Sequence, residues 1–193
     1  EEQGAVVRAV AKRRLEFTWG RACARAALAR LGCPPVAIAV GEQRAPMWPA
    51  GYLGSITHCQ GHCAAAVARG QGSPTDALTS LGLDVEPAQP LPDDVARMVC
   101  NDRELAWIGQ HDADGLPGQR LVFSAKESIY KCQFPLTRRF LDFHDVEVVF
   151  TEDGRFAVRA PSLPAAESRL HGRYAFRAGF VLTTAIWRGP PPE

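Results

Sequence analysis

The chain has 193 residues, of which 46% are hydrophobic and 22% charged, and its formal net charge is +1. This composition is typical of one folded domain, or of two small halves that share an interface, and it argues against disorder and against a strongly basic nucleic-acid-binding protein. The apolar stretches are too short to span a bilayer and the start shows no signal-peptide pattern, so we expect a soluble, cytoplasmic protein with no membrane partner.

Apolar residues recur at helical spacing over residues 6–31, which predicts one long helix or two before a Gly-Pro-Pro segment. The apolar face is expected to include Val10, Leu15 and Leu28. Only Glu16 is acidic in this run. A solvated surface and a site for an anionic ligand are both open interpretations of the basic residues on the other face. These are Arg8, Lys12, Arg13, Arg14, Arg21, Arg25 and Arg30.

The next segments predict a strand at residues 36–40 and a Gly- and Pro-rich loop at residues 41–54. The stretch GSITHCQGHCAAAVA, residues 54–68, then brings together His58, Cys59, His62 and Cys63. This spacing fits half of a zinc site, but no second pair of ligands is evident, so we expect the two cysteines to pack as small hydrophobic residues. The six cysteines are scattered along the chain, which predicts reduced thiols.

The segment LTSLGLDVEP, residues 78–87, predicts a strand in which Asp84 and Glu86 lie on one face. Two carboxylates this close repel each other unless a cation lies between them. Oxygen ligands in such a pair suit Mg²⁺, which binds one or two carboxylates and leaves positions for water and phosphate. A solvated outer strand face is the alternative.

The segment FSAKESIYKC, residues 123–132, predicts a helix with Glu127 and Lys131 four residues apart on one face. Ser124 and Glu127 also match a capping box, in which Lys131 would be only a salt-bridge partner. Helix rules alone therefore leave a structural role for Glu127 open.

The C-terminal segments 145–150, 155–159, 173–178 and 180–187 predict strands, joined in part by turns at residues 152–154 and 178–179. With the earlier elements they predict an α+β fold of two similar halves, related by a pseudo-twofold, each with a helix packed on a small antiparallel sheet. The halves would meet near residues 82–87. We expect subdomains at residues 1–82 and 83–188, followed by a flexible tail at residues 189–193.

Three motifs occur in a fixed order along the chain: SITH, GLDVEP and FSAKESIYK. With them the chain resembles the 4′-phosphopantetheinyl transferases of the two-lobed, monomeric (Sfp-like) type, and in particular the actinobacterial-type enzymes. That family shows a Ser/Thr-His motif, then G-[IL]-D-x-E, then [WF]-S-x-K-E-[SA]-x-x-K. The resemblance extends over residues 12–150 and implies the 4′-phosphopantetheinyl transferase fold.

The resemblance implies an enzyme that transfers the 4′-phosphopantetheine arm of coenzyme A to a serine of apo acyl or peptidyl carrier proteins and releases adenosine 3′,5′-bisphosphate. It implies a Mg²⁺ cofactor, with Mn²⁺ as an alternative, a monomer, and a place in fatty-acid, polyketide or nonribosomal-peptide synthesis. Two other functions fit the same residues. One is a non-catalytic coenzyme A or nucleotide-binding module, and the other is a Mg²⁺-dependent phosphohydrolase.

Matched position by position, the resemblance assigns metal binding to Asp84, Glu86 and Glu127. It makes Glu127 the leading candidate for the base, acting directly or through a metal-held water. Lys131 matches the lysine beside the pyrophosphate, so the expected catalytic residues are Glu127, Lys131 and Asp84.

The resemblance also implies the coenzyme A contacts. Arg13 and Arg21 match arginines at the 3′-phosphate and adenosine end, and His58 matches a histidine that binds a coenzyme A phosphate. The loop around Arg44 departs from the family pattern, and Lys126 is expected on a different side of its helix from Lys131. The expected contacts are Arg13, Arg21, Arg44, Thr57, His58, Lys126 and Lys131. The segment FPLTRRF, residues 134–140, is expected to meet the carrier protein.

Overall fold

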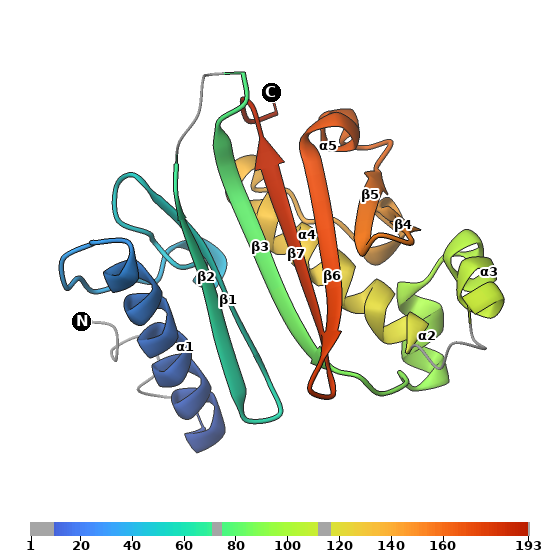
Figure 1. Ribbon diagram of the computed structural model, residues 1–193, viewed down its shortest axis with the longest axis horizontal. Coiled ribbons are helices and arrows are strands. Elements are labelled where there is room, and N and C mark those ends of the chain that lie inside the picture. Colours follow the sequence, from blue (N-terminus) through green and yellow to red (C-terminus); the bar gives the residue numbers. More distant parts are fainter. Residues whose placement is uncertain (1–9, 71–74, 112–116, 193) are drawn as a thin grey trace.

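The computed structural model describes residues 10–70, 75–111 and 117–192, and it contains two antiparallel sheets (Figure 1). In the N-terminal half, helix α1 (Ala11–Arg30) packs on a two-stranded sheet of β1 (Tyr52–Cys59) and β2 (His62–Arg69). In the C-terminal half, helix α4 (Gly118–Thr137) packs on β3 (Leu78–Pro87) and β7 (Phe180–Arg188). The predicted α+β class, with helices packed on antiparallel sheets, is confirmed.

The second sheet has five strands in the order β3-β7-β6-β5-β4. Its other strands are β4 (Glu147–Thr151), β5 (Arg155–Arg159) and β6 (Leu170–Arg177). The smaller elements are η2 (Glu42–Arg44), α2 (Asp93–Val99), α3 (Asp102–His111), η4 (Phe143–Asp145) and α5 (Pro164–Arg169). None of the described helices combines the length and the apolar character that crossing a membrane requires.

Helix α1 buries a narrower face than its sequence pattern predicts. Gly20, Ala24 and Leu28 are buried, whereas Val10 and Leu15, which the pattern assigns to the apolar face, are exposed. A Cβ atom on Gly20 would lie 2.8 Å from Cγ2 of Ile56, which shows how closely the helix approaches β1. Residues four apart therefore make the contact, two of them small, whereas Val10 and Leu15 are left outside it.

The strand predicted at residues 36–40 is also wrong. This segment is extended but forms only an isolated bridge between Val40 and Pro46. The facing segment contains Pro46 and Pro49, which have no N–H to donate, so a longer ladder cannot form. Ile38 nevertheless lies in the core of the N-terminal half.

A tight hairpin joins β1 and β2. Gln60 and Gly61 have φ angles of 40° and 81°, the left-handed values that a two-residue hairpin turn requires. The register places His58 opposite Cys63 near the end of β1. All six cysteines are free thiols.

The strands predicted in the C-terminal half are confirmed, and β3 ties them to the first half. Strand β3 pairs with β7 from Ser80 to Pro87 and also packs against β1. The predicted subdomain boundary at residue 82 therefore falls inside a continuous strand, and the division at that residue stays a prediction. The predicted flexible tail is anchored where it begins, because Gly189 donates to the carbonyl of Ala77 and Pro190 accepts from Trp187.

Helices α2 and α3 lie in a segment for which the sequence analysis made no prediction. At α3, Asn101 and Glu104 form a reciprocal capping box with two backbone-to-side-chain hydrogen bonds of 2.9 Å. By contrast, α4 begins at Gly118, well before Ser124. Ser124 and Glu127 are therefore interior helix residues, which excludes the capping-box explanation of that motif.

Gly82 allows α4 to approach β3 at the point where the next residues carry the acidic motif. A Cβ atom at this position would lie 1.9 Å from the carbonyl oxygen of Ser128 and 2.8 Å from the backbone nitrogen of Cys132. Both are backbone atoms of α4, so a rotamer change cannot relieve the clash. The glycine of the GLDVEP motif is therefore a packing requirement.

We expect Gly82→Ala to lower the free energy of unfolding by about 1–3 kcal/mol, because the added methyl must push α4 away from β3. Urea unfolding followed by circular dichroism measures this change. Gly109→Ala is the matched control, since a Cβ at Gly109 meets nothing within 4 Å. Gly109 lies in the last turn of helix α3, where this change should stabilise the protein by up to about 1 kcal/mol. Equal effects of the two substitutions would contradict the proposed contact.

Candidate active site

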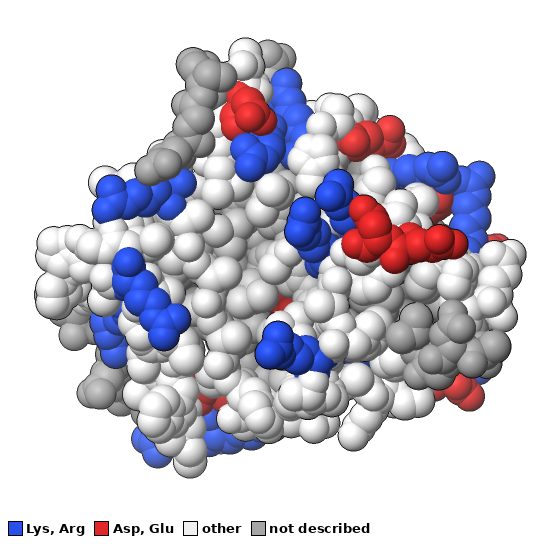
Figure 2. Space-filling model, viewed as in Figure 1, with Lys and Arg blue, Asp and Glu red and all other residues white. Residues whose placement is uncertain are grey.

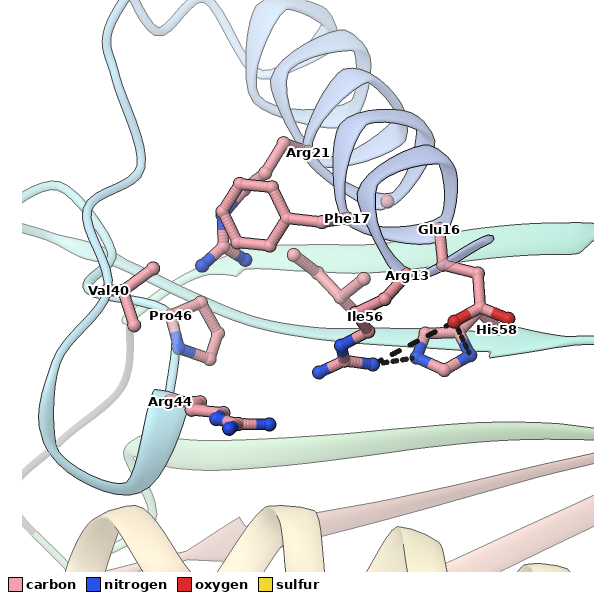
Figure 3. A pocket seen from close by; sticks show the side chains of 10 residues that line it. Arg13, Glu16, Phe17, Arg21, Val40, Arg44, Pro46, Ile56 and His58 are labelled. Atoms are coloured by element: carbon pink, nitrogen blue, oxygen red, sulfur yellow. Dashed lines mark hydrogen bonds and ion pairs between the residues drawn. The ribbon is translucent and has the colours of Figure 1, made fainter. Parts of the chain in front are cut away.

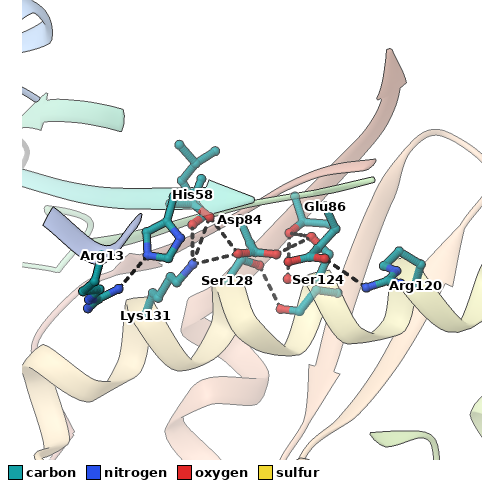
Figure 4. A network of polar contacts seen from close by, with 12 residues as sticks. Arg13, His58, Asp84, Glu86, Arg120, Ser124, Ser128 and Lys131 are labelled. Atoms are coloured by element: carbon teal, nitrogen blue, oxygen red, sulfur yellow. Dashed lines mark hydrogen bonds and ion pairs between the residues drawn. The ribbon is translucent and has the colours of Figure 1, made fainter. Parts of the chain in front are cut away.

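The carboxylate of Asp84 is the centre of a polar network at the junction of the two halves (Figure 4). Asp84 is buried on β3 and accepts three hydrogen bonds. Thr57 Oγ1 on β1 donates at 3.0 Å, Ser124 Oγ on α4 at 2.8 Å, and Lys131 Nζ on α4 at 2.7 Å. One carboxylate thus connects an element of the N-terminal half to the strand and helix of the C-terminal half.

Lys131 is held against β3 by this network. Besides Asp84, its Nζ atom lies 3.3 Å from both Thr57 Oγ1 and the carbonyl oxygen of Leu83. The side chain stays 27% exposed, so the ammonium group is reachable from solvent. Lys131 therefore pairs with Asp84, rather than with Glu127 as an ordinary helical salt bridge would require.

Glu127 lies one helical turn before Lys131 and makes no hydrogen bond with any described residue. Burial raises the pKa of its carboxyl group, and the negative charge of Asp84 adds to this effect while the charge of Lys131 opposes it. A carboxylate with a raised pKa and free lone pairs is suited to accept a proton.

Glu86 lies beyond Asp84 on the same face of β3, as predicted, and Arg120 holds it. Arg120 Nη1 is 3.0 Å from Glu86 Oε2, and the guanidinium also donates to the carbonyl oxygens of Gln89 and Pro90. Burial, followed by the charge of Asp84, raises the pKa of Glu86, while Arg120 lowers it. The ion pair with Arg120 therefore offsets the repulsion between the carboxylates of Asp84 and Glu86.

Ser124 and Arg120 belong to this network, although neither was predicted as a site residue from the sequence. Residues 120, 124, 127 and 131 recur at intervals of three and four along α4, which is the spacing of one helical face. This spacing could have identified Arg120 and Ser124 as neighbours of Glu127 and Lys131, but it does not indicate which strand this helical face contacts.

The acidic residues fit a divalent cation by their chemistry. Asp84, Glu86 and Glu127 supply only oxygen atoms, and the charge of Asp84 raises the pKa of both glutamates, so negative charge accumulates here. Among the described residues, however, no three His, Cys, Asp or Glu side chains are grouped closely enough to hold an ion by themselves. The fit is therefore to an ion such as Mg²⁺, which takes one or two carboxylates together with phosphate oxygens.

A cavity of about 200 Å³ lies beside this network, between α1, β1 and the loop before β1 (Figure 3). Four predicted coenzyme A contacts line it: Arg13, Arg21, Arg44 and His58. Arg13 and Arg21 come from α1, and Arg44 comes from η2. The structure therefore brings Arg44 to the same cavity although its sequence motif departs from the family pattern.

Arg21 is buried, and its guanidinium carbon lies 4.8 Å from the ring centroid of Phe17. Of the two interpretations of the basic residues on this helix, a solvated surface therefore does not apply to Arg21, which lines the cavity. Other basic residues of α1, including Lys12, Arg14 and Arg30, are exposed. Figure 2 shows blue side chains along the part of the surface that α1 forms. The basic residues of α1 thus divide into an exposed set and a set that lines the cavity.

A second, mainly apolar cavity of about 380 Å³ lies on the other side of Glu127. Tyr130, Phe140, Leu141 and Met98 line it together with Glu127. Phe140 is 75% exposed, which agrees with its predicted place in a docking surface, but Phe134 is 6% exposed and belongs to the core. Residues 134–140, the segment predicted to meet the carrier protein, thus have only some of their apolar side chains on the surface.

The ammonium group of Lys126 does not contact the Asp84 network. Its Nζ atom donates to Glu104 Oε2 at 2.8 Å and to the carbonyl oxygens of Val99 and Phe143 at 2.7 and 2.8 Å. These three acceptors use all three protons of the ammonium group. Glu104 also accepts from the backbone N–H of Val148. This arrangement leaves no proton for a phosphate, so the geometry argues against the predicted role of Lys126 as a coenzyme A ligand.

The fold and the site define a class of protein in which a basic cavity and an acidic cluster meet at the junction of two α+β halves. The N-terminal domain model of the 4′-phosphopantetheinyl transferases matches residues 1–68, and the model of the 4′-phosphopantetheinyl transferase superfamily matches residues 80–185. The chain belongs to the 4′-phosphopantetheinyl transferase superfamily, which confirms the resemblance and the enzyme class that the motifs predict.

Three curated relatives agree with this assignment and with the predicted actinobacterial type. The 4′-phosphopantetheinyl transferase Svp of Streptomyces mobaraensis is 44% identical over 98% of this chain and 78% of its own length. The 4′-phosphopantetheinyl transferase PptT of Mycobacterium tuberculosis is 39% identical over 96% of this chain and 84% of its own. The 4′-phosphopantetheinyl transferase Npt of Nocardia iowensis is 45% identical over 79% of this chain and 67% of its own.

The buried pair of Lys126 and Glu104 generates a stability prediction. We expect Lys126→Met to lower the free energy of unfolding by about 3–5 kcal/mol, because the Glu104 carboxylate would stay buried without its cation. At a temperature where the variant is folded, its Kd for coenzyme A should equal that of the unchanged protein. Chemical unfolding and calorimetric titration measure the two quantities.

Arg159→Met is the control for this experiment, because the ion pair of Arg159 with Glu147 is 2.8 Å long but its arginine is 56% exposed. Loss of such a pair should cost no more than about 1 kcal/mol. A tenfold weaker affinity of the Lys126 variant for coenzyme A, with little loss of stability, would instead restore the role of this lysine as a ligand.

Proposed function

We propose that this protein transfers the 4′-phosphopantetheine arm of coenzyme A to a serine of apo acyl or peptidyl carrier proteins in a Mg²⁺-dependent reaction. One observation carries the proposal: the basic cavity, the Asp84 network and the apolar cavity follow one another across the junction of the two halves. This order matches the order of phosphate groups, pyrophosphate and apolar arm that the substrate presents.

The basic cavity suits the phosphorylated adenosine end of coenzyme A. Arginine forks match phosphate oxygens in geometry as well as charge, and Arg13, Arg21 and Arg44 converge on one cavity from two elements (Figure 3). Phe17 and Ile56 supply apolar surface in the same cavity, against which a base can pack.

The apolar cavity suits the pantetheine arm. It borders Glu127, so an arm that lies in it ends at the acidic cluster, where the phosphorus to be attacked must be. The exposed ring of Phe140 forms part of its rim, where the carrier protein has to approach.

In the reaction, the serine hydroxyl oxygen forms a bond to the β-phosphorus while the bond from that phosphorus to the bridging oxygen breaks. The leaving group is adenosine 3′,5′-bisphosphate, which takes up the charge of the bridging oxygen. Lys131 is placed to stabilise this charge, because its ammonium group is held between Asp84 and Thr57 and is partly exposed. Thr57 thus acts through Lys131 and Asp84 rather than as a separate base.

We assign the proton of the serine hydroxyl to Glu127, which accepts it directly or through a water. Glu127 has free lone pairs and a raised pKa, whereas Lys131 is engaged with Asp84. A bound Mg²⁺ would be held by Asp84 and Glu86, with Glu127 as a third candidate, and would neutralise charge on the pyrophosphate. Arg120 keeps Glu86 in place at the edge of this site.

The deciding experiment is intact mass spectrometry of an apo carrier protein incubated with this protein, coenzyme A and Mg²⁺. We expect a gain of one phosphopantetheine mass that EDTA abolishes. Binding of coenzyme A without transfer to any of several carrier proteins would indicate a binding module. Cleavage of coenzyme A without a carrier protein would indicate a phosphohydrolase.

Two isosteric substitutions test the acidic cluster. We expect Glu127→Gln to reduce the transfer rate by at least about a hundredfold, the lower end of what a general base contributes. We expect Asp84→Asn to cause a loss of about the same size, because it removes the charge that holds Lys131 and would hold Mg²⁺. Circular dichroism should show the same fold for both variants. Glu152→Gln is the control, since Glu152 is an exposed residue in the β4–β5 turn. Transfer at the unchanged rate in either cluster variant would disprove the roles given to these acids.

The basic cavity has a separate kinetic signature. We expect His58→Ala to raise the KM for coenzyme A roughly tenfold with a smaller change in kcat, because one hydrogen bond to a charged group contributes about 1.5–3 kcal/mol. Steady-state kinetics at saturating carrier protein measures both constants. An unchanged KM would remove His58 from the phosphate-binding set.

A further inference from the structure

Glu16 is an acidic residue within the otherwise basic cavity, and the mechanism above gives it no role. It lies on α1, and its side chain is 17% exposed. Its Oε2 atom is 3.9 Å from Arg13 Nη1 and 3.8 Å from His58 Nδ1 (Figure 3). A carboxylate in a phosphate-binding cavity weakens anion binding unless it serves another purpose, so its position requires an explanation.

The contacts of His58 determine where its ring proton lies. Arg13 Nη1 is 2.9 Å from His58 Nε2, and a guanidinium group can only donate. Nε2 must therefore accept, which places the proton of the neutral ring on Nδ1. Nδ1 is the atom that faces Glu16, so the carboxylate favours the same tautomer.

This tautomer cannot receive a phosphate as it stands. The lone pair of Nε2 would face the lone pairs of a phosphate oxygen once Arg13 turns its donors to that phosphate. The ring becomes a donor at Nε2 when it takes up a second proton. The protonated ring then donates from Nε2 to the phosphate and keeps its Nδ1 proton toward Glu16.

We propose that Glu16 is a positioning residue, which together with Arg13 favours the Nδ1-protonated tautomer of His58 and allows this ring to take up a proton when a phosphate group of coenzyme A binds. The inference rests on the proposed function, because it takes coenzyme A as the ligand of the basic cavity. Binding of coenzyme A is then accompanied by uptake of one proton at His58, and Glu16 is the residue that favours this uptake.

The charges around His58 support a neutral ring in the free protein and a charged ring in the complex. Burial lowers the pKa of His58, and Arg13 from α1 and Lys131 from α4 lower it further, while Glu16 raises it. Arg44 adds positive charge to the same cavity. On the neighbouring strand β2, Cys63 lies opposite His58, and burial raises the pKa of its thiol. A bound phosphate dianion reverses this balance, so binding takes up a proton at a pH between the two pKa values of His58.

The tautomer can be tested on the unchanged free protein. Long-range proton–nitrogen NMR of the histidine rings at pH 8 should show His58 with its proton on Nδ1, and Glu16→Gln should shift the ring toward the Nε2-protonated form. A wild-type ring protonated on Nε2 would overturn the inference without any variant being made.

Proton uptake is measured by calorimetric titration of coenzyme A at pH 8, repeated in buffers of different ionisation enthalpy. At this pH the phosphate monoester, whose second pKa is about 6, is already fully ionised and contributes no proton. We expect the unchanged protein to take up a substantial fraction of one proton, and its Kd to rise toward tenfold per pH unit above neutrality. Glu16→Gln should lose most of this uptake, and its Kd should depend less on pH.

Glu147→Gln is the matched control, because the side chain of Glu147 is also 17% exposed and contacts two arginines, but on β4 of the other half. It should keep the full uptake. A weaker Kd of the Glu16 variant with unchanged proton uptake would show a purely structural role and overturn the inference. If coenzyme A binds and transfer occurs but no proton is taken up, only this inference fails, whereas absence of coenzyme A binding would contradict the proposed function itself.

Discussion

The buried carboxylate of Asp84 is the constraint on which the site depends. A buried charge is tolerated only when it is paired and hydrogen-bonded, and here the partners come from β1 and α4 as well as from the ammonium group of Lys131. Satisfying this one group therefore fixes the two halves relative to each other. It also sets the rotation of α4, which decides that Glu127 and Lys131 face the junction and Lys126 faces away.

Lys126 and Glu104 fix the opposite side of the same helix. Their ion pair is almost completely buried and joins α4 to α3, to β4 and to the segment around Phe143. Helix α4 is thus held between two charged contacts, one at the junction and one inside the C-terminal half. Adjacent residues of the motif have different contacts, since the ammonium group of Lys126 is enclosed by three acceptors, whereas the carboxylate of Glu127 makes no hydrogen bond with any described residue and borders the apolar cavity.

This packing produces a basic cavity and an apolar cavity on either side of the Asp84 network. Arginines from α1 and from the loop before β1 line the first, and apolar side chains around Phe140 line the second. Neither half contains both cavities. In the proposed function one extended substrate would use both, which would make the two-lobed arrangement a requirement of the site. Strand β3, which pairs with β7 and packs on β1, joins the lobes.

The regular patterns of the sequence predicted the regular parts of the structure. Alternation identified β3 and the strands of the C-terminal half, and the GLDVEP and FSAKESIYK motifs identified the acidic residues that the fold assembles. The errors arose where local pattern and tertiary contact disagree. Val10, just before α1, and Leu15 within it are exposed, because Gly20, Ala24 and Leu28 make the contact of this helix with the sheet. The prolines that face residues 36–40 prevent a longer ladder there.

The sequence by itself determined which chemical groups are available, because motif order and residue type define the acids, the lysine and the arginines. Only the tertiary structure decided their partners. Lys131 pairs with Asp84 rather than with the glutamate four residues before it, Lys126 is enclosed by three acceptors, and Glu16 lies among the arginines of the basic cavity. These outcomes depend on contacts between residues far apart in the chain, and helical or strand periodicity carries no information about which faces will meet.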